Sequence, residues 1–227
     1  MSIFTHVKAI AFDYYGTIAN KLALASEIDL VFPGQGEHFC KLWFAQTQRY
    51  CFQNGMMDRH IAWRELTQAA FDFAAKELSI SVDKITRDQW IDADSRLPIY
   101  PDASDALTNL AKHFDLYVLS MGGLEMILKS QKSSQISRLF KNNISIESHQ
   151  IYKPSKAAYE IGVREIGVNP DEIAFVSGNS FDVIGAKNYG YPTIWVRRYG
   201  QPLDGLGLLP DLIVTNLGQI VTSLPDL

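Results

Sequence analysis

The sequence predicts an α/β fold: a doubly wound, mostly parallel, Rossmann-like sheet core with a helical cap inserted after strand one. Strand-like apolar runs alternate with helical patterns over most of the 227 residues, as βαβ units require. The interval between Gly16 and Pro98 is the exception, because it holds helical patterns and no convincing strand. We therefore expect a core domain of residues 1–18 and 98–227, and a helical cap domain of residues 19–97.

Six apolar runs predict the strands of the sheet. Residues 7–13 are mostly apolar or small and end in Asp13, which is typical of a buried parallel strand. Five more strands are expected at residues 116–120, 144–147, 172–177, 193–197 and 212–215. Periodic apolar positions predict helices between many of them, at residues 102–113, 124–130, 155–167 and 182–189.

The inserted interval carries two long helical patterns. Residues 37–52 and 62–78 each repeat apolar side chains at steps of three or four. Pro33 and Gly34 mark a turn before the first of them, and Pro98 marks the return of the chain to the core.

Composition limits the class of partner. The net charge is −4 and no block of Lys or Arg stands out, which argues against a nucleic acid or an anionic membrane. Cys40 and Cys51 are the only cysteines and belong to no Cys/His cluster, so neither a zinc site nor a disulfide framework is expected. The first residues lack a signal-peptide pattern, and no apolar run is long enough to cross a membrane. We expect a soluble, cytoplasmic protein.

Polar residues follow the predicted strands at positions where open α/β sheets place their chemistry. Asp13 ends strand one and could be a covalent nucleophile, although a capping Asp at the end of an edge strand is the simpler alternative. A nucleophilic Asp needs a neighbouring cation, and Lys153 could supply it. Asn179 and Asp182, which follow the strand at 172–177, could orient water for hydrolysis of an ester. The candidate hydroxyl donors are Thr17, Ser120 and Ser177.

These motifs resemble the haloacid dehalogenase superfamily over essentially the whole chain. The first motif is Asp13-Tyr-Tyr-Gly-Thr17, and the later ones are Ser120, Lys153-Pro154 and Ser177-Gly-Asn-Ser-Phe-Asp182. Phosphatases of the superfamily carry a second Asp two residues after the nucleophile and acidic Mg²⁺ ligands in the last motif. Here these positions are Tyr15 and Asn179. Without the second Asp an alkoxide loses its proton donor, and without one carboxylate a hard-cation site is weakened.

Both substitutions resemble the type II (S)-2-haloacid dehalogenase branch. Other matching segments, in order, are Phe32-Pro-Gly-Gln-Gly36, Leu42-Trp43, Leu119-Ser120, Tyr152-Lys-Pro154 and Asn188-Tyr-Gly-Tyr-Pro-Thr-Ile-Trp195. The resemblance implies that Asp13 displaces halide with inversion and that water held near Asn179, Lys153 and Asp182 hydrolyses the ester. The resemblance also implies that the reaction needs neither a metal nor a cofactor. It further implies a homodimer. Thr17 and Ser177 would position these groups. The residues expected around the substrate are Tyr15, Phe44, Trp63, Ser120, Met121, Tyr159 and Phe181.

One departure concerns substrate recognition. Dehalogenases of this branch carry a cap arginine after the Leu-Trp pair, where this chain has Phe44, and an aromatic ring cannot replace a guanidinium that pairs with an anion. Met121 and Gln48 also depart from the pattern, and Arg49 or Arg59 is a candidate substitute for the arginine. Two alternatives therefore stay open: a hydrolase of changed specificity, such as a weak phosphatase, and a non-catalytic binding protein. Trp63 and Phe181 could likewise be packing residues.

Overall fold

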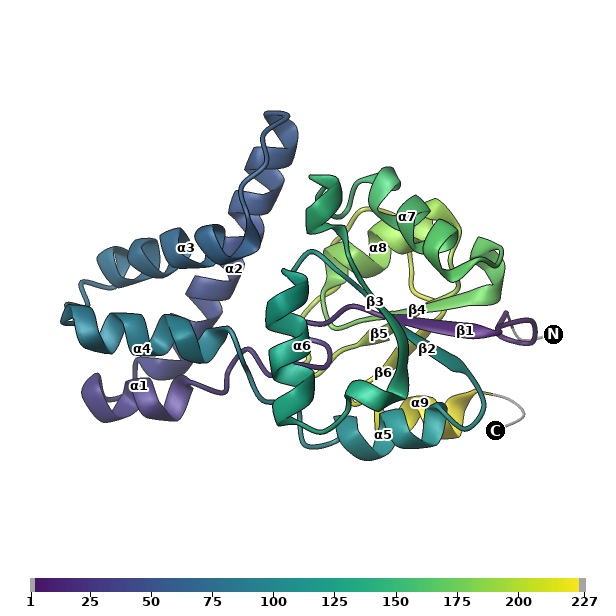
Figure 1. Ribbon diagram of the computed structural model, residues 1–227, viewed down its shortest axis with the longest axis horizontal. Helices are drawn as coiled ribbons and strands as arrows, with labels where there is room; N and C mark the ends of the chain where they lie inside the picture. The colour runs from purple at the N-terminus through teal and green to yellow at the C-terminus, as the bar shows by residue number, and fades with distance from the viewer. Residues whose placement is uncertain (1–2, 225–227) are drawn as a thin grey trace.

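The computed structural model describes residues 3–224 of the chain. The central layer of the molecule is a parallel sheet (Figure 1). The strand order is β3-β2-β1-β4-β5-β6, and every pairing is parallel. The strands are β1 (Ala9–Phe12), β2 (Asp115–Ser120), β3 (Phe140–Ser145), β4 (Ile173–Ser177), β5 (Thr193–Val196) and β6 (Leu212–Val214). The expected α/β fold with a doubly wound parallel sheet is confirmed.

Strand order reverses beside β1, and this creates the functional edge of the sheet. β1 and β4 consist of buried residues only, as expected for central strands covered on both faces. Phe12 lies opposite Val118 of β2 and Val176 of β4. The carboxyl ends of these three strands therefore meet beside Asp13, where open α/β sheets bind their ligands.

Helices cover both faces of the sheet. α7 (Lys156–Ile166) packs on α8 (Ser180–Tyr189), which also contacts β4 and β5, whereas α5 (Ala103–Leu110) packs on α9 (Gly218–Ser223). In Figure 1 the first pair lies above the sheet and the second below it. α6 (Leu124–Ser133) packs beside β3. Three short 3-10 helices complete the core, η1 (Ser137–Leu139), η2 (Ile146–His149) and η3 (Pro170–Glu172).

The inserted segment forms the helical lobe at the left of Figure 1. It contains α1 (Ala25–Val31), α2 (Gly36–Met56), α3 (Trp63–Glu77) and α4 (Lys84–Asp94). Edge-on aromatic contacts join Phe39 and Trp43 of α2 to Phe71 of α3, and Phe39 also contacts Trp90 of α4. The Trp43 indole donates to the Thr67 carbonyl at 2.7 Å. The lobe thus has an aromatic core of its own.

The two linkers between lobe and core are paired with each other. Ala19 forms an isolated antiparallel bridge with Ile99, and the Tyr100 N–H donates to the Ile18 carbonyl at 2.9 Å. Away from the linkers, the Tyr152 hydroxyl both accepts from the Ile61 N–H and donates to the Ile61 carbonyl, at 2.9 and 2.8 Å. The lobe is therefore fixed to the core at two separate places.

The structure corrects one predicted strand and adds three helices. The strand expected at residues 144–147 is β3, which begins at Phe140, while Glu147 belongs to η2. β3 lies at the edge of the sheet and four of its six residues are polar, so its apolar pattern is incomplete. α1, α4 and α9 were not predicted. α4 has few apolar positions, although Asp83 caps it by accepting from the N–H groups of Ile85 and Thr86.

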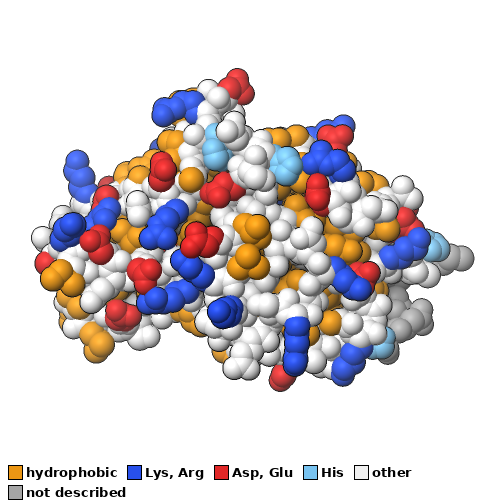
Figure 2. Space-filling model, in the orientation of Figure 1, with side chains coloured by type: hydrophobic (Ala, Val, Ile, Leu, Met, Phe, Trp, Pro, Cys, Tyr) orange, Lys and Arg blue, Asp and Glu red, His pale blue; other side chains and the backbone are white. Residues whose placement is uncertain are grey.

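The face shown in Figure 2 mixes charges of both signs. Lys and Arg side chains are interspersed with Asp and Glu, most densely over the helical lobe at the left. No described helix is long and apolar enough to cross a membrane.

A buried hydrogen-bond chain beside β1 makes a first prediction. The Tyr14 hydroxyl donates to Ser130 Oγ at 2.7 Å, and Ser130 Oγ donates to the Leu97 carbonyl at the end of the cap. We expect Tyr14→Phe to lower the free energy of unfolding by about 1 kcal/mol, because one buried hydrogen bond is lost. Urea denaturation measures this. Tyr117→Phe is the control, since no described residue is hydrogen-bonded to its hydroxyl; an equal loss there would contradict the assignment.

Candidate active site

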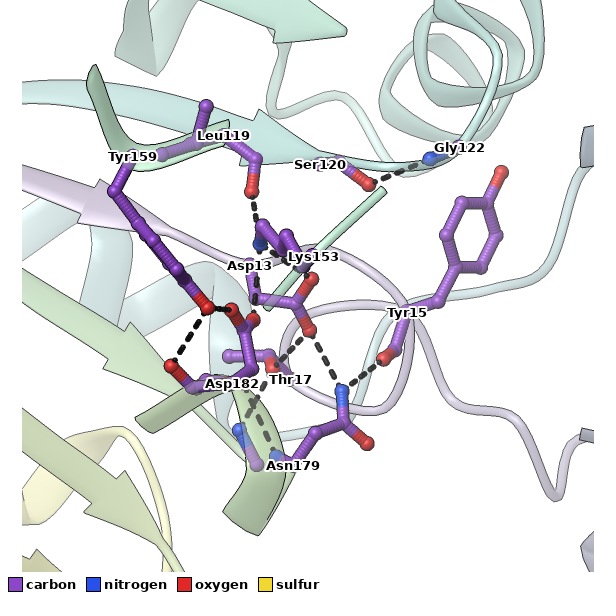
Figure 3. Close-up of polar contacts among 12 residues, drawn as sticks. Asp13, Tyr15, Thr17, Leu119, Ser120, Gly122, Lys153, Tyr159, Asn179 and Asp182 are labelled. Atoms are coloured by element: carbon purple, nitrogen blue, oxygen red, sulfur yellow. Dashed lines mark hydrogen bonds and ion pairs between the residues drawn. The ribbon is translucent and has the colours of Figure 1, made fainter. Parts of the chain in front are cut away.

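Asp13 follows β1 and is surrounded by hydrogen-bond donors (Figure 3). Its Oδ2 accepts from Thr17 Oγ1 at 2.9 Å and from Asn179 Nδ2 at 2.8 Å. Its Oδ1 lies 3.3 Å from Lys153 Nζ. Both oxygens of the Asp13 carboxyl group therefore face hydrogen-bond donors. Asp13 is 5% exposed, so little water competes for it.

Lys153 lies at the centre of the cluster, and its side chain is fully buried. Its ammonium donates to the Leu119 carbonyl at 2.6 Å, to Asp182 Oδ2 at 2.9 Å and to Asp13 Oδ1 at 3.3 Å. These three acceptors use all three N–H groups of the ammonium. One cation is thus fixed between two carboxylates, that of Asp13 directly after β1 and that of Asp182 in α8.

Asp182 lies behind the lysine in the first turn of α8. The Tyr159 hydroxyl donates to its Oδ1 at 2.8 Å and approaches its backbone carbonyl at 3.1 Å. Burial raises the pKa of the Asp182 carboxyl to about 6, while Lys153 opposes that rise. The pKa of the Asp182 carboxyl is therefore raised although a lysine is paired with it.

The loop after β4 orients the amide and hydroxyl groups. Thr17 Oγ1 accepts from the Gly178 N–H at 2.8 Å, and Ser177 Oγ accepts from the Asn179 N–H at 3.1 Å. Gly178 has to be glycine, because a Cβ there would lie 2.3 Å from the Gly16 carbonyl oxygen. Asn179 Nδ2 donates to Asp13 and to the Tyr15 carbonyl, and its Oδ1 accepts from Gln48 Nε2 at 3.2 Å. Gln48 is therefore a cap residue that fixes the orientation of the Asn179 amide.

The residues expected around the substrate do not share one cavity. Tyr15, Phe44 and Trp63 line a small pocket between lobe and core, with the Tyr15 and Trp63 rings stacked at 5.3 Å. Phe181 instead lines a separate cavity of about 650 Å³ between the end of α2 and residues 150–155, where it packs on Phe52.

The remaining expected residues lie at the sheet edge. Ser120 is buried at the end of β2, where its Oγ accepts from the Gly122 N–H at 3.1 Å, and Met121 follows it, also buried. Tyr159, which we expected to contact substrate, is fully buried behind Asp182. Ser177 is hydrogen-bonded within the loop after β4, and none of the described hydrogen bonds joins it to Asp13.

Comparison with known proteins decides the family. A model of the haloacid dehalogenase-like hydrolases matches residues 7–190. The chain belongs to this family.

Named relatives span nearly the whole chain. It is 31% identical over 217 residues to an (S)-2-haloacid dehalogenase of Pseudomonas sp. strain YL, covering 95% of this chain and 94% of that protein. It is 32% identical over 216 residues to haloacetate dehalogenase H-2 of Moraxella sp. strain B, covering 95% and 96%. The solved L-2-haloacid dehalogenase of Xanthobacter autotrophicus with chloropropionic acid covalently bound superposes with a TM-score of 0.87 at 26% identity, covering 95% and 97%.

Within this haloacid dehalogenase-like hydrolase, the two candidate substitutes for the cap arginine lie elsewhere. Arg49 is exposed on α2, and Arg59 is exposed at the rim of the larger cavity. The cation that does line the small pocket is Lys21, whose ammonium lies 4.3 Å from the centre of the Phe44 ring. Sequence analysis missed it, because a single lysine in an irregular linker carries no motif.

No described group of three or more His, Cys, Asp or Glu side chains is arranged to hold a metal ion. Asp13 and Asp182 both face Lys153, so the position between the two carboxylates is taken by an ammonium. Cys40 and Cys51 are free and buried, and burial raises the pKa of each thiol to about 12.

The buried lysine makes a prediction about stability. We expect Lys153→Met to lower the free energy of unfolding by about 3–5 kcal/mol at pH 7, because it leaves two carboxylates buried without their cation. The loss should shrink as the pH falls from 7 toward 5, since Asp182 can then take up a proton in the folded state.

Urea denaturation at several pH values measures this effect. Lys187→Met is the control, because the Lys187–Asp211 pair is partly exposed and should contribute only about 0–1 kcal/mol. Equal losses in both variants would contradict a special role for Lys153.

Proposed function

We propose that the protein hydrolyses the carbon–halogen bond of short (S)-2-haloalkanoic acids to 2-hydroxy acids through an aspartyl ester. The observation that carries the proposal is the Asp13 carboxylate, held by Lys153, Thr17 and Asn179 with no acidic partner among the described residues beside it. A carboxylate in these surroundings can act as a nucleophile. The names of the relatives, including a protein solved with covalently bound chloropropionic acid, support the same chemistry.

In the first step an oxygen of Asp13 attacks the carbon that carries the halogen. A C–O bond forms, the C–X bond breaks, and its electron pair leaves with the halide. No proton is transferred, so the leaving group needs neither a general acid nor a metal. Tyr15 fits this scheme, because burial raises the pKa of its phenol well above the usual range and keeps it neutral.

The substrate carboxylate is assigned to the ends of β1 and β2. Ser120 supplies a hydroxyl there, and the backbone N–H groups of Tyr14 and Met121 donate to no described backbone carbonyl. Both strand ends are adjacent, because Lys153 bridges the Leu119 carbonyl and Asp13. Donors from two strands can therefore hold the carboxylate beside the nucleophile.

In the second step water attacks the carbonyl carbon of the Asp13 ester. Lys153 lies at an oxygen of that carboxyl and can stabilise the negative charge that develops on it. Asp182 lies on the other side of Lys153, and its pKa of about 6 suits a group that accepts a proton near neutral pH. Release of the 2-hydroxy acid and one proton restores the Asp13 carboxylate. Thr17, Asn179, Ser177 and Tyr159 position these groups.

Halide release tests the function directly. We expect chloride release from (S)-2-chloropropionate, with (R)-lactate as the product and no loss of rate in EDTA. Asp13→Asn should lower the rate about 1,000-fold or more while remaining folded, since an amide oxygen is a poor nucleophile. No release from chloro or bromo acids of two to four carbons would refute the proposal. Mg²⁺-dependent turnover of a phosphate ester would favour a phosphatase instead.

Asp182 predicts the acidic limb of the pH profile. Activity should fall below about pH 6, because protonation of Asp182 removes the carboxylate that accepts a proton from water. Tyr159→Phe deletes a hydrogen bond that lowers the Asp182 pKa, so the limb should move upward by about 0.5–1 pH unit.

Tyr191→Phe is the matched control for this profile. The Tyr191 hydroxyl donates to the Tyr159 backbone carbonyl at 2.8 Å and does not touch Asp182. If the acidic limb moves in both variants, or in neither, then Asp182 is not the group whose ionisation controls the rate. Dimerisation and a cytoplasmic location stay predictions of the sequence.

A further inference from the structure

A second lysine lies beside the nucleophile. Lys21 belongs to the linker that leaves the core after Thr17, and it is half-buried. A Cβ placed on Gly16 would lie 3.3 Å from Asn179 Oδ1 and 3.6 Å from Lys21 Nζ. The ammonium is therefore close to the amide that holds Asp13, on the side of the cluster that faces the cap.

The Lys21 charge is not neutralised by the protein. The Phe44 ring is its nearest partner, at 4.3 Å, and no described carboxylate or carbonyl accepts a hydrogen bond from its Nζ. Burial lowers the pKa of this ammonium to about 8, and Lys41 adds to the effect, whereas Asp13 opposes it. An unpaired cation kept next to a nucleophile, at a cost in desolvation, is typical of a functional group.

Two more unsatisfied donors line the same pocket. The Tyr15 hydroxyl and the Trp63 Nε1–H are both buried and have no hydrogen-bond partner. The pocket has room for about one water-sized particle and is walled by the rings of Trp43 and Phe44. Three hydrogen-bond donors around a space for one water-sized particle suit a small, spherical anion.

We propose that Lys21, together with the Tyr15 hydroxyl and the Trp63 indole N–H, binds the departing halide. This assignment rests on the proposed dehalogenation. As the C–X bond breaks, negative charge moves from Asp13, which Lys153 holds, to the halogen, which Lys21 receives. Lys21 keeps its proton throughout and acts by electrostatic stabilisation, which is strongest where charge develops in the transition state.

Asp94 of α4 is the one acidic group that lines this pocket, and burial raises its pKa to about 7. Its Oδ2 has no hydrogen-bond partner. With its proton Asp94 is neutral and tolerates a halide, whereas its ionised form repels one. The titratable groups around Lys21 are Asp13, Tyr15, Cys40, Lys41 and Asp94. Ionisation of Asp94 and loss of the Lys21 proton both make halide binding weaker as the pH rises.

Kinetics of two variants test the assignment once wild-type turnover is measured. Lys21→Met should lower kcat/KM for (S)-2-chloropropionate about 100-fold, a loss typical of one electrostatic donor. Inhibition by bromide should weaken about 10-fold, and inhibition by (R)-lactate should stay within about 2-fold, because lactate carries the carboxylate and no halide. Lys129→Met is the control, since this exposed lysine of α6 pairs with Glu125 outside the pocket and should change neither constant by more than about 2-fold.

Lys21→Arg separates a bound cation from a packing role. It should retain bromide inhibition and extend it above pH 8, because a guanidinium keeps its proton where the Lys21 ammonium loses it. Weaker lactate inhibition with unchanged bromide inhibition in Lys21→Met would place the substrate carboxylate at Lys21 and overturn the proposal.

A binding measurement keeps this test separate from the proposed reaction. The thermal midpoint of Asp13→Asn, which cannot turn over, should rise when gluconate is replaced by bromide at constant ionic strength, since a ligand of the folded state stabilises it. The rise should vanish in Asp13→Asn/Lys21→Met and persist in Asp13→Asn/Lys129→Met. If bromide raises the thermal midpoint but the wild type releases no halide, the proposed dehalogenase activity is refuted and the proposed anion site is retained. No rise, or a rise that survives Lys21→Met, would overturn the anion site.

Discussion

The buried Lys153 ammonium is the interaction on which the rest of the site depends. It lies between Asp13 and Asp182 and ties both to the Leu119 carbonyl, so it joins the ends of β1 and β2 to the start of α8. A charge taken out of water stabilises a fold only when its partners are close and complete, and here all three N–H groups have acceptors. Tyr159 satisfies the far oxygen of Asp182 and completes the arrangement.

The cap completes the site by reaching into the core at several points. Gln48 of α2 fixes the Asn179 amide, Trp63 of α3 stacks on Tyr15, and the backbone N–H of Trp63 donates to Glu147 Oε1 at 2.6 Å. Each contact joins a cap residue to a residue at the carboxyl edge of the sheet. The small pocket therefore exists only when the cap is docked, which couples cap position to the assembly of the site and to exclusion of water.

The sequence predicted which polar residues cluster at the sheet edge, because their positions are encoded locally. Asp13 and the residues around Asn179 directly follow buried strands, and a residue at a strand end has a defined place once the strand order is known. The bounds of edge strand β3 were misplaced because four of its six residues are polar, and Lys21 was missed because an irregular linker has no period. Both depend on tertiary placement.

Phe44 illustrates the same limit from the other side. In the sequence alone, Phe44 stands where the resembling dehalogenases have an arginine, which suggests that a site for an anion has been lost. In the fold the Phe44 ring faces the ammonium of Lys21, which belongs to the linker that leaves the core after Thr17. The ring supplies a face for a cation that arrives from elsewhere in the chain. Charge at a site is a property of the space around it, so a lysine far from Phe44 in the sequence can supply a positive charge to the pocket that the Phe44 ring lines.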